Sequence, residues 1–303
     1  MDDRVTVTIE AGVADVRLVR ADKMNALDPA MFEALRATGR RLIREPGLRA
    51  VVLSGEGRAF CAGLDFGRFE KMASQPGDGG MGISHEMRLG TRTHGLSNDA
   101  QYAVMVWRDV PVPVIAAVHG VAFGGGFQLA LGADLRFVTP DARLSVMEIK
   151  WGLVPDMGGA LLMRDLARAD VIRELTWSGR VFDGTEAAAL GLATRVCADP
   201  RAEALALARE IAGRSPDAIR AGKRLLRLAE SADPATVLQA ESDEQIALLG
   251  SPNQVEAVAA NLHKRAPAFV DPKALARAAR AGFTPPASAA PPVEAADRAA
   301  VIG

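Results

Sequence analysis

The chain has 303 residues, with 36 basic and 37 acidic side chains and a net charge of −1. This length can bury a sizeable core, and the balanced charge supplies no general attraction to nucleic acid or to an anionic membrane. Two cysteines, Cys61 and Cys197, exclude a disulfide scaffold, and the four histidines lack the spacing of paired metal ligands. No apolar signal region or membrane-length run is present, so we expect a cytoplasmic protein with no metal, nucleic-acid or membrane partner.

The N-terminal region predicts a hairpin followed by a helix. Residues 5–9 and 14–18 alternate apolar and polar side chains on either side of Ala11-Gly12, which is typical of two strands joined by a turn. Asp28-Pro29 indicates a helix start, with Asp28 as the N-cap, and Pro46-Gly47 ends the helical pattern.

Three apolar runs further along predict a buried sheet. Residues 50–54 and 112–118 are almost wholly apolar, and residues 135–138 are a weaker example. Strands buried on both faces are typical of parallel sheets with helices outside, so the first two hundred residues favour an α/β class. The glycine-rich residues 67–97 are either a surface loop or the wall of a binding site.

From about Pro200 the chain becomes helical. Apolar residues recur at helical spacing, Ser215-Pro216 interrupts the pattern, and further runs are expected over 234–249 and 253–263. Residues 284–303 are rich in proline and alanine, so we expect a disordered tail there. The predicted domains are therefore 1–199, 200–283 and 284–303.

Two turns of small residues follow the predicted strands. Gly124, Gly125 and Gly126 precede a helical pattern, where bare N–H groups and the positive end of a helix dipole would face a ligand. Residues 55–66 form a second such turn after a buried strand. Each turn alone could be simple tight packing. Because ligands bind beyond the carboxyl ends of strands, the two together could offer two N–H groups to one oxygen, as an oxyanion hole does.

Two acids follow within residues 144–159. Glu148 has the apolar neighbours Met147 and Ile149, so it is either a surface acid at a strand edge or a buried carboxyl with a raised pKa. A raised pKa would suit it to taking and returning protons. Asp156 lies in a Pro-Asp-Met-Gly-Gly sequence and is either a turn acid or a second proton-transfer group.

With these segments in view, the chain resembles the crotonase family of enoyl-CoA hydratases, enoyl-CoA isomerases and related enzymes, from about Val5 to Phe269. Each motif is short, and their order and spacing carry the resemblance. In chain order the motifs are residues 23–27 (KMNAL), 59–65 (AFCAGLD), 113–120 (PVIAAVHG), 124–126 (GGG), 133–134 (AD), 148–159 and 264–269 (KRAPAF).

The resemblance implies a ββα spiral core over 1–199, which holds the site, and a helical region over 200–283 that assembles trimers or dimers of trimers. It implies an acyl-CoA thioester substrate and no separate cofactor, because coenzyme A is part of the substrate. The thioester oxygen would lie between the N–H groups of Leu64 and Gly125. The implied CoA-binding residues are Lys23, Ala59, Ala62, Gly63, Asp65 and Gly124.

The acidic positions bear on the reaction. Hydratases of the family hold a water between two Glu residues; here the later position is Glu148 and the earlier one is Gln128, whose amide cannot accept a proton. A single Glu resembles the enoyl-CoA isomerases. Asp156 resembles an acid of the dienoyl-CoA isomerases, which also carry an acid at the position of Gln128. We therefore expect isomerase-type proton transfer, with Glu148 as general acid/base, Asp156 assisting, and Gln128 positioning substrate or water.

Other reactions remain open at this point. They are hydration of an enoyl-CoA, thioester hydrolysis or another enolate reaction on the same oxyanion hole, and non-catalytic binding of acyl-CoA. The retained Glu148, Asp156 and both glycine turns argue against a non-catalytic role.

Overall fold

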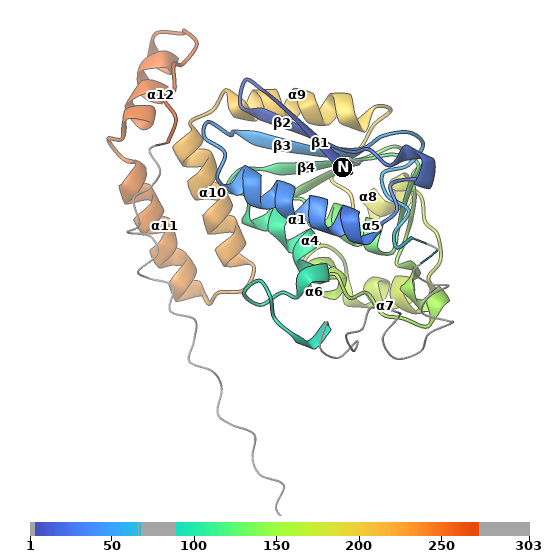
Figure 1. The fold of residues 1–303 in the computed structure, drawn as a ribbon. Coiled ribbons are helices and arrows are strands. Elements are labelled where there is room, and N and C mark those ends of the chain that lie inside the picture. The colour runs from blue at the N-terminus through green and yellow to red at the C-terminus, as the bar shows by residue number, and fades with distance from the viewer. Residues whose placement is uncertain (1–3, 66, 68–88, 273–303) are drawn as a thin grey trace, which may run out of the picture. The chain divides into compact units, whose positions relative to one another are not determined.

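The computed structural model describes residues 4–65, 67 and 89–272. The described residues up to Asp271 belong to one compact unit (Figure 1). The expected tail at 284–303 lies outside the described residues, and so does most of the glycine-rich segment 67–97.

The elements alternate between strands and helices along the first two thirds of the chain. The strands are β1 (Val5–Glu10), β2 (Val13–Leu18), β3 (Ala50–Gly55), β4 (Val114–Val118), β5 (Val121–Phe123), β6 (Leu135–Val138), β7 (Arg143–Ser145) and β8 (Arg195–Val196). The helices are α1 (Pro29–Ile43), α4 (Asp99–Asp109), α5 (Gly125–Leu131), α6 (Gly159–Met163), α7 (Ala169–Ser178), α8 (Gly184–Ala189), α9 (Pro200–Ala212), α10 (Pro216–Ala229), α11 (Pro234–Leu248) and α12 (Pro252–Leu262), with 3-10 turns η1 (Ala21–Lys23) and η2 (Met147–Trp151).

The main sheet has the order β1-β2-β3-β4-β6-β8. The hairpin pair β1 and β2 is antiparallel, and every later pair in this sheet is parallel. A second sheet pairs β5 with β7, also in parallel. The predicted hairpin and the predicted parallel sheet are both confirmed. The short strands β5, β7 and β8 were not predicted, because they have too few residues to show an alternation of apolar and polar side chains.

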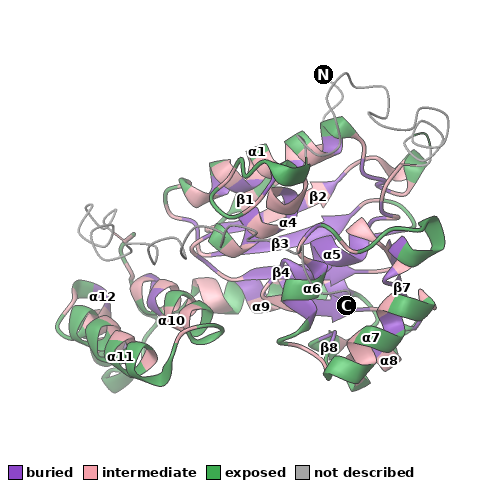
Figure 2. Cartoon of the chain, turned by 90° about the horizontal axis from the view of Figure 1, so that it is seen from below, coloured by how far each residue is buried: buried purple, intermediate pink, exposed green. Residues whose placement is uncertain are grey.

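Helices cover both faces of the main sheet, which is why its central strands are apolar throughout. Val51 and Leu53 of β3 belong to the core packed against α1 and α4, whereas Ala50 and Val52 pack with Ala204 and Ala208 of α9. Figure 2 shows β3 and β4 coloured as buried. Alternate side chains of a strand point to opposite faces, so burial of both faces requires a continuous apolar run.

Local sequence signals set the helix starts. Asp28 caps α1 by accepting from Met31 N at 2.7 Å, with Pro29 at the first helical position, as predicted. Asn98 and Gln101 form a reciprocal capping box on α4. The same combination of a capping side chain and a following proline begins each C-terminal helix, at Asp199-Pro200, Ser215-Pro216, Asp233-Pro234 and Ser251-Pro252.

The C-terminal helices differ in how they contact the core. The predicted boundary at residue 200 falls at the start of α9, which packs on β2, β3, β4 and β6 within the same compact unit. In contrast, α11 packs on α10 and buries none of its residues. Among the described residues no helix is both long and apolar enough to cross a membrane.

Candidate active site

The two small-residue turns lie against each other. Cys61 N donates to Val121 O at 3.0 Å and Phe123 N donates to Cys61 O at 3.2 Å, so the segment after β3 runs along β5. A Cβ at Gly63 would lie 2.5 Å from Phe123 O and 3.6 Å from Gly125 N. Only glycine permits this approach, and its φ of +86° favours glycine as well.

Two backbone N–H groups are available where these turns meet. Leu27 N donates to Gly63 O at 2.7 Å and Asp65 N donates to Leu27 O at 3.1 Å. Because Leu27 bonds to the residues on either side of Leu64, the Leu64 N–H points away from Leu27. Gly125 is the first residue of α5, where N–H groups have no intrahelical acceptor. Within the described part of the chain, neither the Leu64 nor the Gly125 N–H has an acceptor.

Glu148 reaches this junction through the β5 and β7 pair. Phe123 pairs with Ser145, and Gly124 N donates to Ser145 O at 3.0 Å. The chain then enters η2, where Glu148 is buried and is not at a strand edge. A Cβ on Gly124 would lie 3.3 Å from Glu148 Oε1, so the carboxyl lies against the glycine turn.

Gln128 of α5 holds this carboxyl in place. Its Nε2 donates to Glu148 Oε1 at 2.6 Å, and its own Oε1 accepts from the N–H groups of Met157 and Gly159, each at 2.9 Å. The two backbone donors settle which end of the amide is the oxygen. Glu148 Oε2 is buried and has no hydrogen-bond partner among the described residues. One carboxylate oxygen is therefore held, and the other is left for a ligand.

Asp156 lies in the turn between η2 and α6. The bonds from Met157 and Gly159 to Gln128 fix the turn immediately after it. Asp156 retains exposed surface, yet the protein around its carboxyl desolvates it enough to raise its pKa. The Asp156 side chain can therefore be reached by a ligand, and its ionised form is less favoured than that of an aspartate in water.

The site electrostatics disfavour two simultaneous negative charges. Burial raises the pKa of Glu148, and the negative charge of Asp156 raises it further, whereas hydrogen bonds, including the one from Gln128, oppose the rise. The two carboxyls are thus near enough to interact. A carboxyl with a raised pKa can exchange protons nearer to neutrality than an exposed one.

The residues that the resemblance assigns to CoA binding lie along neighbouring segments. Ala62 N donates to Met24 O at 2.9 Å, and Asn25 Nδ2 donates to Ala59 O at 2.9 Å, so residues 21–25 run beside residues 59–65. Lys23 is exposed at the end of η1. Gly63 and Gly124 lie at the junction described above.

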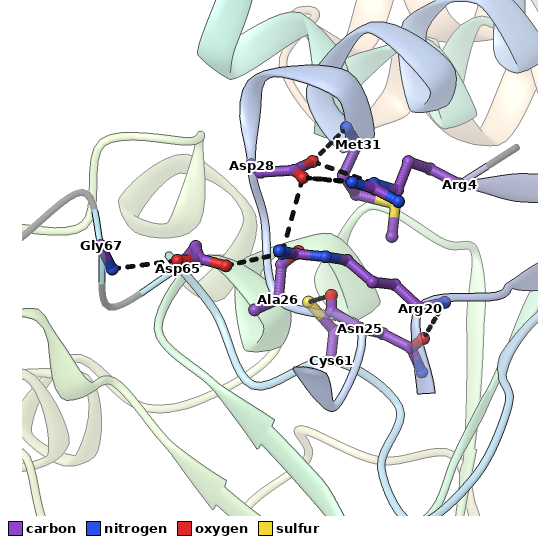
Figure 3. A network of polar contacts seen from close by, with 9 residues as sticks. All are labelled: Arg4, Arg20, Asn25, Ala26, Asp28, Met31, Cys61, Asp65 and Gly67. Atoms are coloured by element: carbon purple, nitrogen blue, oxygen red, sulfur yellow. Dashed lines mark hydrogen bonds and ion pairs between the residues drawn. The ribbon is translucent and has the colours of Figure 1, made fainter. Parts of the chain in front are cut away.

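Asp65, another of the implied CoA-binding residues, forms an ion pair with Arg20. Its Oδ2 accepts from Arg20 Nη1 at 2.7 Å and its Oδ1 accepts from Gly67 N at 2.9 Å (Figure 3). Sequence reasoning did not identify Arg20 or the role of Asp28 beside it. One signal in the sequence could have identified the pair. Arg20 follows β2 by two residues and Asp65 follows β3, and the carboxyl ends of these two parallel strands lie at the same edge of the sheet.

Cys61 is not an activated nucleophile. Its side chain is buried, its Sγ–H donates to Asn25 O at 3.1 Å, and burial raises its pKa to about 12. A thiolate is required for nucleophilic attack, so this thiol is inert at neutral pH. Among the described residues no group of three His, Cys, Asp or Glu side chains is placed to hold a metal ion.

The fold and the paired turns define a crotonase-like α/β protein. The family model for enoyl-CoA hydratase/isomerase matches residues 8–272, nearly the whole chain, and the chain belongs to this family. A crystal structure of an enoyl-CoA hydratase from Polaromonas sp. JS666 superposes with a TM-score of 0.77 at 28% identity, covering 88% of this chain and 99% of that one.

Sequence relatives carry two kinds of name. The chain is 31% identical over 258 residues to the mitochondrial Delta(3,5)-Delta(2,4)-dienoyl-CoA isomerase of Mus musculus, covering 84% of this chain and 77% of that protein. It is 30% identical over 268 residues to the mitochondrial enoyl-CoA hydratase domain-containing protein 2 of Homo sapiens, covering 86% of each. These matches confirm the predicted family and the predicted kind of enzyme, and they are consistent with an acyl-CoA substrate.

Proposed function

We propose that the protein is a double-bond isomerase of enoyl-CoA thioesters, with Glu148 as its general acid/base. The contact of 2.6 Å between Gln128 and Glu148 supports this choice most directly. The family's hydratases hold a water between two carboxylates at these positions. Here the Gln128 amide bonds directly to Glu148, so there is no room for a water between these two groups, and the position of Gln128 offers no carboxylate to accept a proton.

The reaction follows from the free oxygen of Glu148. Glu148 Oε2 removes a proton from the α-carbon of a 3-enoyl thioester, and the electron pair moves to the thioester oxygen as an enolate. The N–H groups of Leu64 and Gly125 stabilise that oxygen; loss of one such donor costs about 2.7–4 kcal/mol. The protonated Glu148 then returns the proton to the γ-carbon, which leaves the double bond next to the thioester.

Asp156 extends this proposal to conjugated substrates. In a dienoyl thioester the proton must return to a carbon further along the chain, beyond the reach of a single fixed carboxyl. Asp156 is exposed, has a raised pKa and interacts with Glu148, so it suits the delivery of that second proton. The similarity to proteins named dienoyl-CoA isomerases supports this assignment.

A substrate panel tests the proposed function. Purified protein is incubated with 2-enoyl-, 3-enoyl- and 3,5-dienoyl-CoA, and products are followed by absorbance and mass. We expect conversion of the 3-enoyl or 3,5-dienoyl thioester with unchanged mass, and an Asp156→Asn variant should lose the dienoyl reaction more than the monoenoyl one. Rapid addition of water to the 2-enoyl thioester would identify a hydratase instead, and binding without turnover would identify a non-catalytic protein.

We also propose that the C-terminal helices assemble the protein into trimers or dimers of trimers. α11 buries no residue in the single chain, and large apolar side chains of α10–α12 are exposed. Apolar surface of this kind on adjacent elements is typical of an interface. The exposed residues on these helices are Leu226, Leu238, Ile246, Val255, Val258 and Leu262, and Leu249 directly after α11 is exposed as well.

A further inference from the structure

We propose that Arg20 is a positioning residue that holds the Leu64 N–H in place for the thioester oxygen, through its ion pair with Asp65. The proposal rests on the proposed function, because it requires the oxygen to lie at Leu64. Neither the sequence motifs nor the family resemblance assigned a role to Arg20.

One guanidinium group holds both sides of the short pairing that presents Leu64. Arg20 Nη1 donates to Asp65 Oδ2 at 2.7 Å and to Ala26 O at 3.0 Å (Figure 3). Ala26 precedes Leu27 and Asp65 follows Leu64, and Leu27 pairs with Leu64. Arg20 therefore bonds to both paired segments, next to the backbone bond from Asp65 N to Leu27 O.

The Arg20 link adds to bonds that join the same two segments before Leu64, from Ala62 N to Met24 O and from Cys61 Sγ to Asn25 O. The pairing of Leu27 with Leu64 is an isolated bridge rather than part of a sheet, with one backbone bond on each side of Leu64. The Leu64 N–H lies in the same peptide plane as Gly63 O, which Leu27 N holds by donating to it at 2.7 Å. The link from Arg20 to Asp65 fixes the residue on the other side of Leu64, so Leu64 is held at both ends. A stabilising donor must be aimed at the position that the oxyanion will occupy.

The surrounding charges make the ion pair rigid. Asp28 lies 3.6 Å from Arg20 Nη1 and accepts from Arg4 at 2.9 Å, and it also caps α1. The side chains of Arg20, Asp28 and Asp65 are only 14%, 16% and 21% exposed, so solvent screens these pairs less than ordinary surface pairs. Burial works against ionisation of Asp65, but the bonds from Arg20 and Gly67 outweigh it and hold its pKa below the usual range.

Direct binding of CoA phosphates by Arg20 is the competing explanation. Both oxygens of Asp65 already accept bonds, and two carboxylates flank the guanidinium. They offset the positive charge that would attract a phosphate. The surroundings of Arg20 thus favour an internal structural contact.

The test measures stabilisation of an enolate without requiring turnover. Acetoacetyl-CoA, whose enolate has its own ultraviolet absorbance, is titrated with pH when bound to the full chain and to Arg20→Met, Arg20→Lys and Asp65→Asn. Arg4→Met is the matched control, because it removes an ion pair to Asp28 and leaves the Arg20–Asp65 contact intact. Dissociation constants for coenzyme A and thermal unfolding are measured on every variant.

We expect the unmodified protein to favour the enolate of bound acetoacetyl-CoA. Arg20→Met should lower the enolate-to-keto ratio roughly tenfold, which is less than the loss when a donor is removed altogether, because the Leu64 N–H remains but is less well aimed. Arg20→Lys and Asp65→Asn should lose less, and Arg4→Met should match the unmodified protein. Coenzyme A should bind to Arg20→Met, Arg20→Lys and Arg4→Met as tightly as to the unmodified protein. If Arg20→Met does not fold, Asp65→Asn, which keeps the side-chain shape, carries the test.

Three other results would overturn the proposal, and they differ in what else they overturn. An unchanged enolate ratio in folded Arg20→Met and Asp65→Asn removes the positioning role alone. Weaker binding of coenzyme A in parallel with the lost enolate makes Arg20 a CoA contact. No enolate stabilisation by the unmodified protein removes the oxyanion hole itself, and the proposed function with it.

Discussion

The two oxygens of the Glu148 carboxyl have different surroundings. Oε1 accepts from Gln128, whereas Oε2 is buried without a partner among the described residues. An unpaired buried oxygen costs stability, and such a cost is typical of a group kept ready for a substrate. In the proposed mechanism, Gln128 therefore matters as well as Glu148.

Removing the Glu148 charge should lower activity and raise stability. We expect Glu148→Gln to lower turnover roughly 10²–10⁴-fold, because the general base is lost. It should also stabilise the fold at neutral pH, because burial disfavours the carboxylate and raises its pKa. The measurements are turnover of the best panel substrate and chemical denaturation.

The pH dependence of this stability follows from the sign of the shift. The raised pKa means that the folded state holds its proton more tightly than the unfolded state, so the ionised carboxyl penalises the fold increasingly as pH rises. The advantage of Glu148→Gln should be full above the folded pKa and vanish below the ordinary value of 4.5. Near-normal turnover in this variant would show that Glu148 is not the base.

Gln128 should control both the reaction and its pH profile. Gln128→Met removes the donor to Glu148, which should raise the Glu148 pKa and move the acid limb of kcat/KM to higher pH. Gln128→Glu supplies a second carboxylate and should increase hydration of a short 2-enoyl-CoA. If neither the pH limb nor the hydration rate changes, the amide does not determine the reaction.

At the scale of elements, the site exists because α5 begins in close contact with the segment after β3. Gly124 and Gly63 both have positive φ, and Gly126 lies directly on the backbone of Cys61. The glycines that the sequence identified as a ligand-binding turn therefore also serve packing. The packing interpretation of this turn is confirmed, and its ligand-binding interpretation stays a prediction.

Two adjacent glycines should respond differently to alanine. A Cβ at Gly126 would lie 2.1 Å from Cys61 O, which is fixed backbone, so Gly126→Ala should destabilise the fold by about 3 kcal/mol. At Gly125 the Cβ meets only the side-chain ends of Met157 at 2.8 Å and Leu27 at 2.9 Å, which can move. Gly125→Ala should therefore cost about 1 kcal/mol. Equal losses of denaturation free energy would contradict this packing argument.

At the scale of the whole molecule, the first two hundred residues and α9 enclose a sheet covered on both faces, whereas α10–α12 offer apolar side chains to solvent. Lys223 fastens α10 to the core by donating to Val112 O at 2.9 Å and to Asp134 at 2.6 Å. α10 is thus bonded to the core, while apolar side chains of α10–α12 remain exposed in the single chain. This arrangement is expected of a region through which chains assemble.

A charge on α11 should dissociate the proposed assembly. Ile246 is 69% exposed in the single chain, and a carboxylate buried in an apolar interface is costly, so Ile246→Glu should yield monomers in analytical ultracentrifugation. Ala37→Glu on the exposed face of α1 is the control and should leave the assembly unchanged. Monomeric unmodified protein, or an intact trimer in Ile246→Glu, would rule out this use of α11.

The sequence alone determined the elements whose signals are local. Continuous apolar runs predicted the parallel strands, because both faces of the sheet are covered, and Asp28 followed by Pro29 predicted the start of α1. The glycine turns and Glu148 were identified in the same way. Strands of two or three residues were missed because their pairing, and not their own pattern, defines them.

Only the tertiary structure decided what these residues do to one another. The bond between Gln128 and Glu148 joins positions 20 residues apart, and the ion pair between Arg20 and Asp65 joins positions 45 apart. Such contacts depend on which strand ends meet at one edge of the sheet, which no local pattern encodes. Composition and charge left the substrate class open, and the folded chain placed the Glu148 carboxyl against the glycine turn that begins α5.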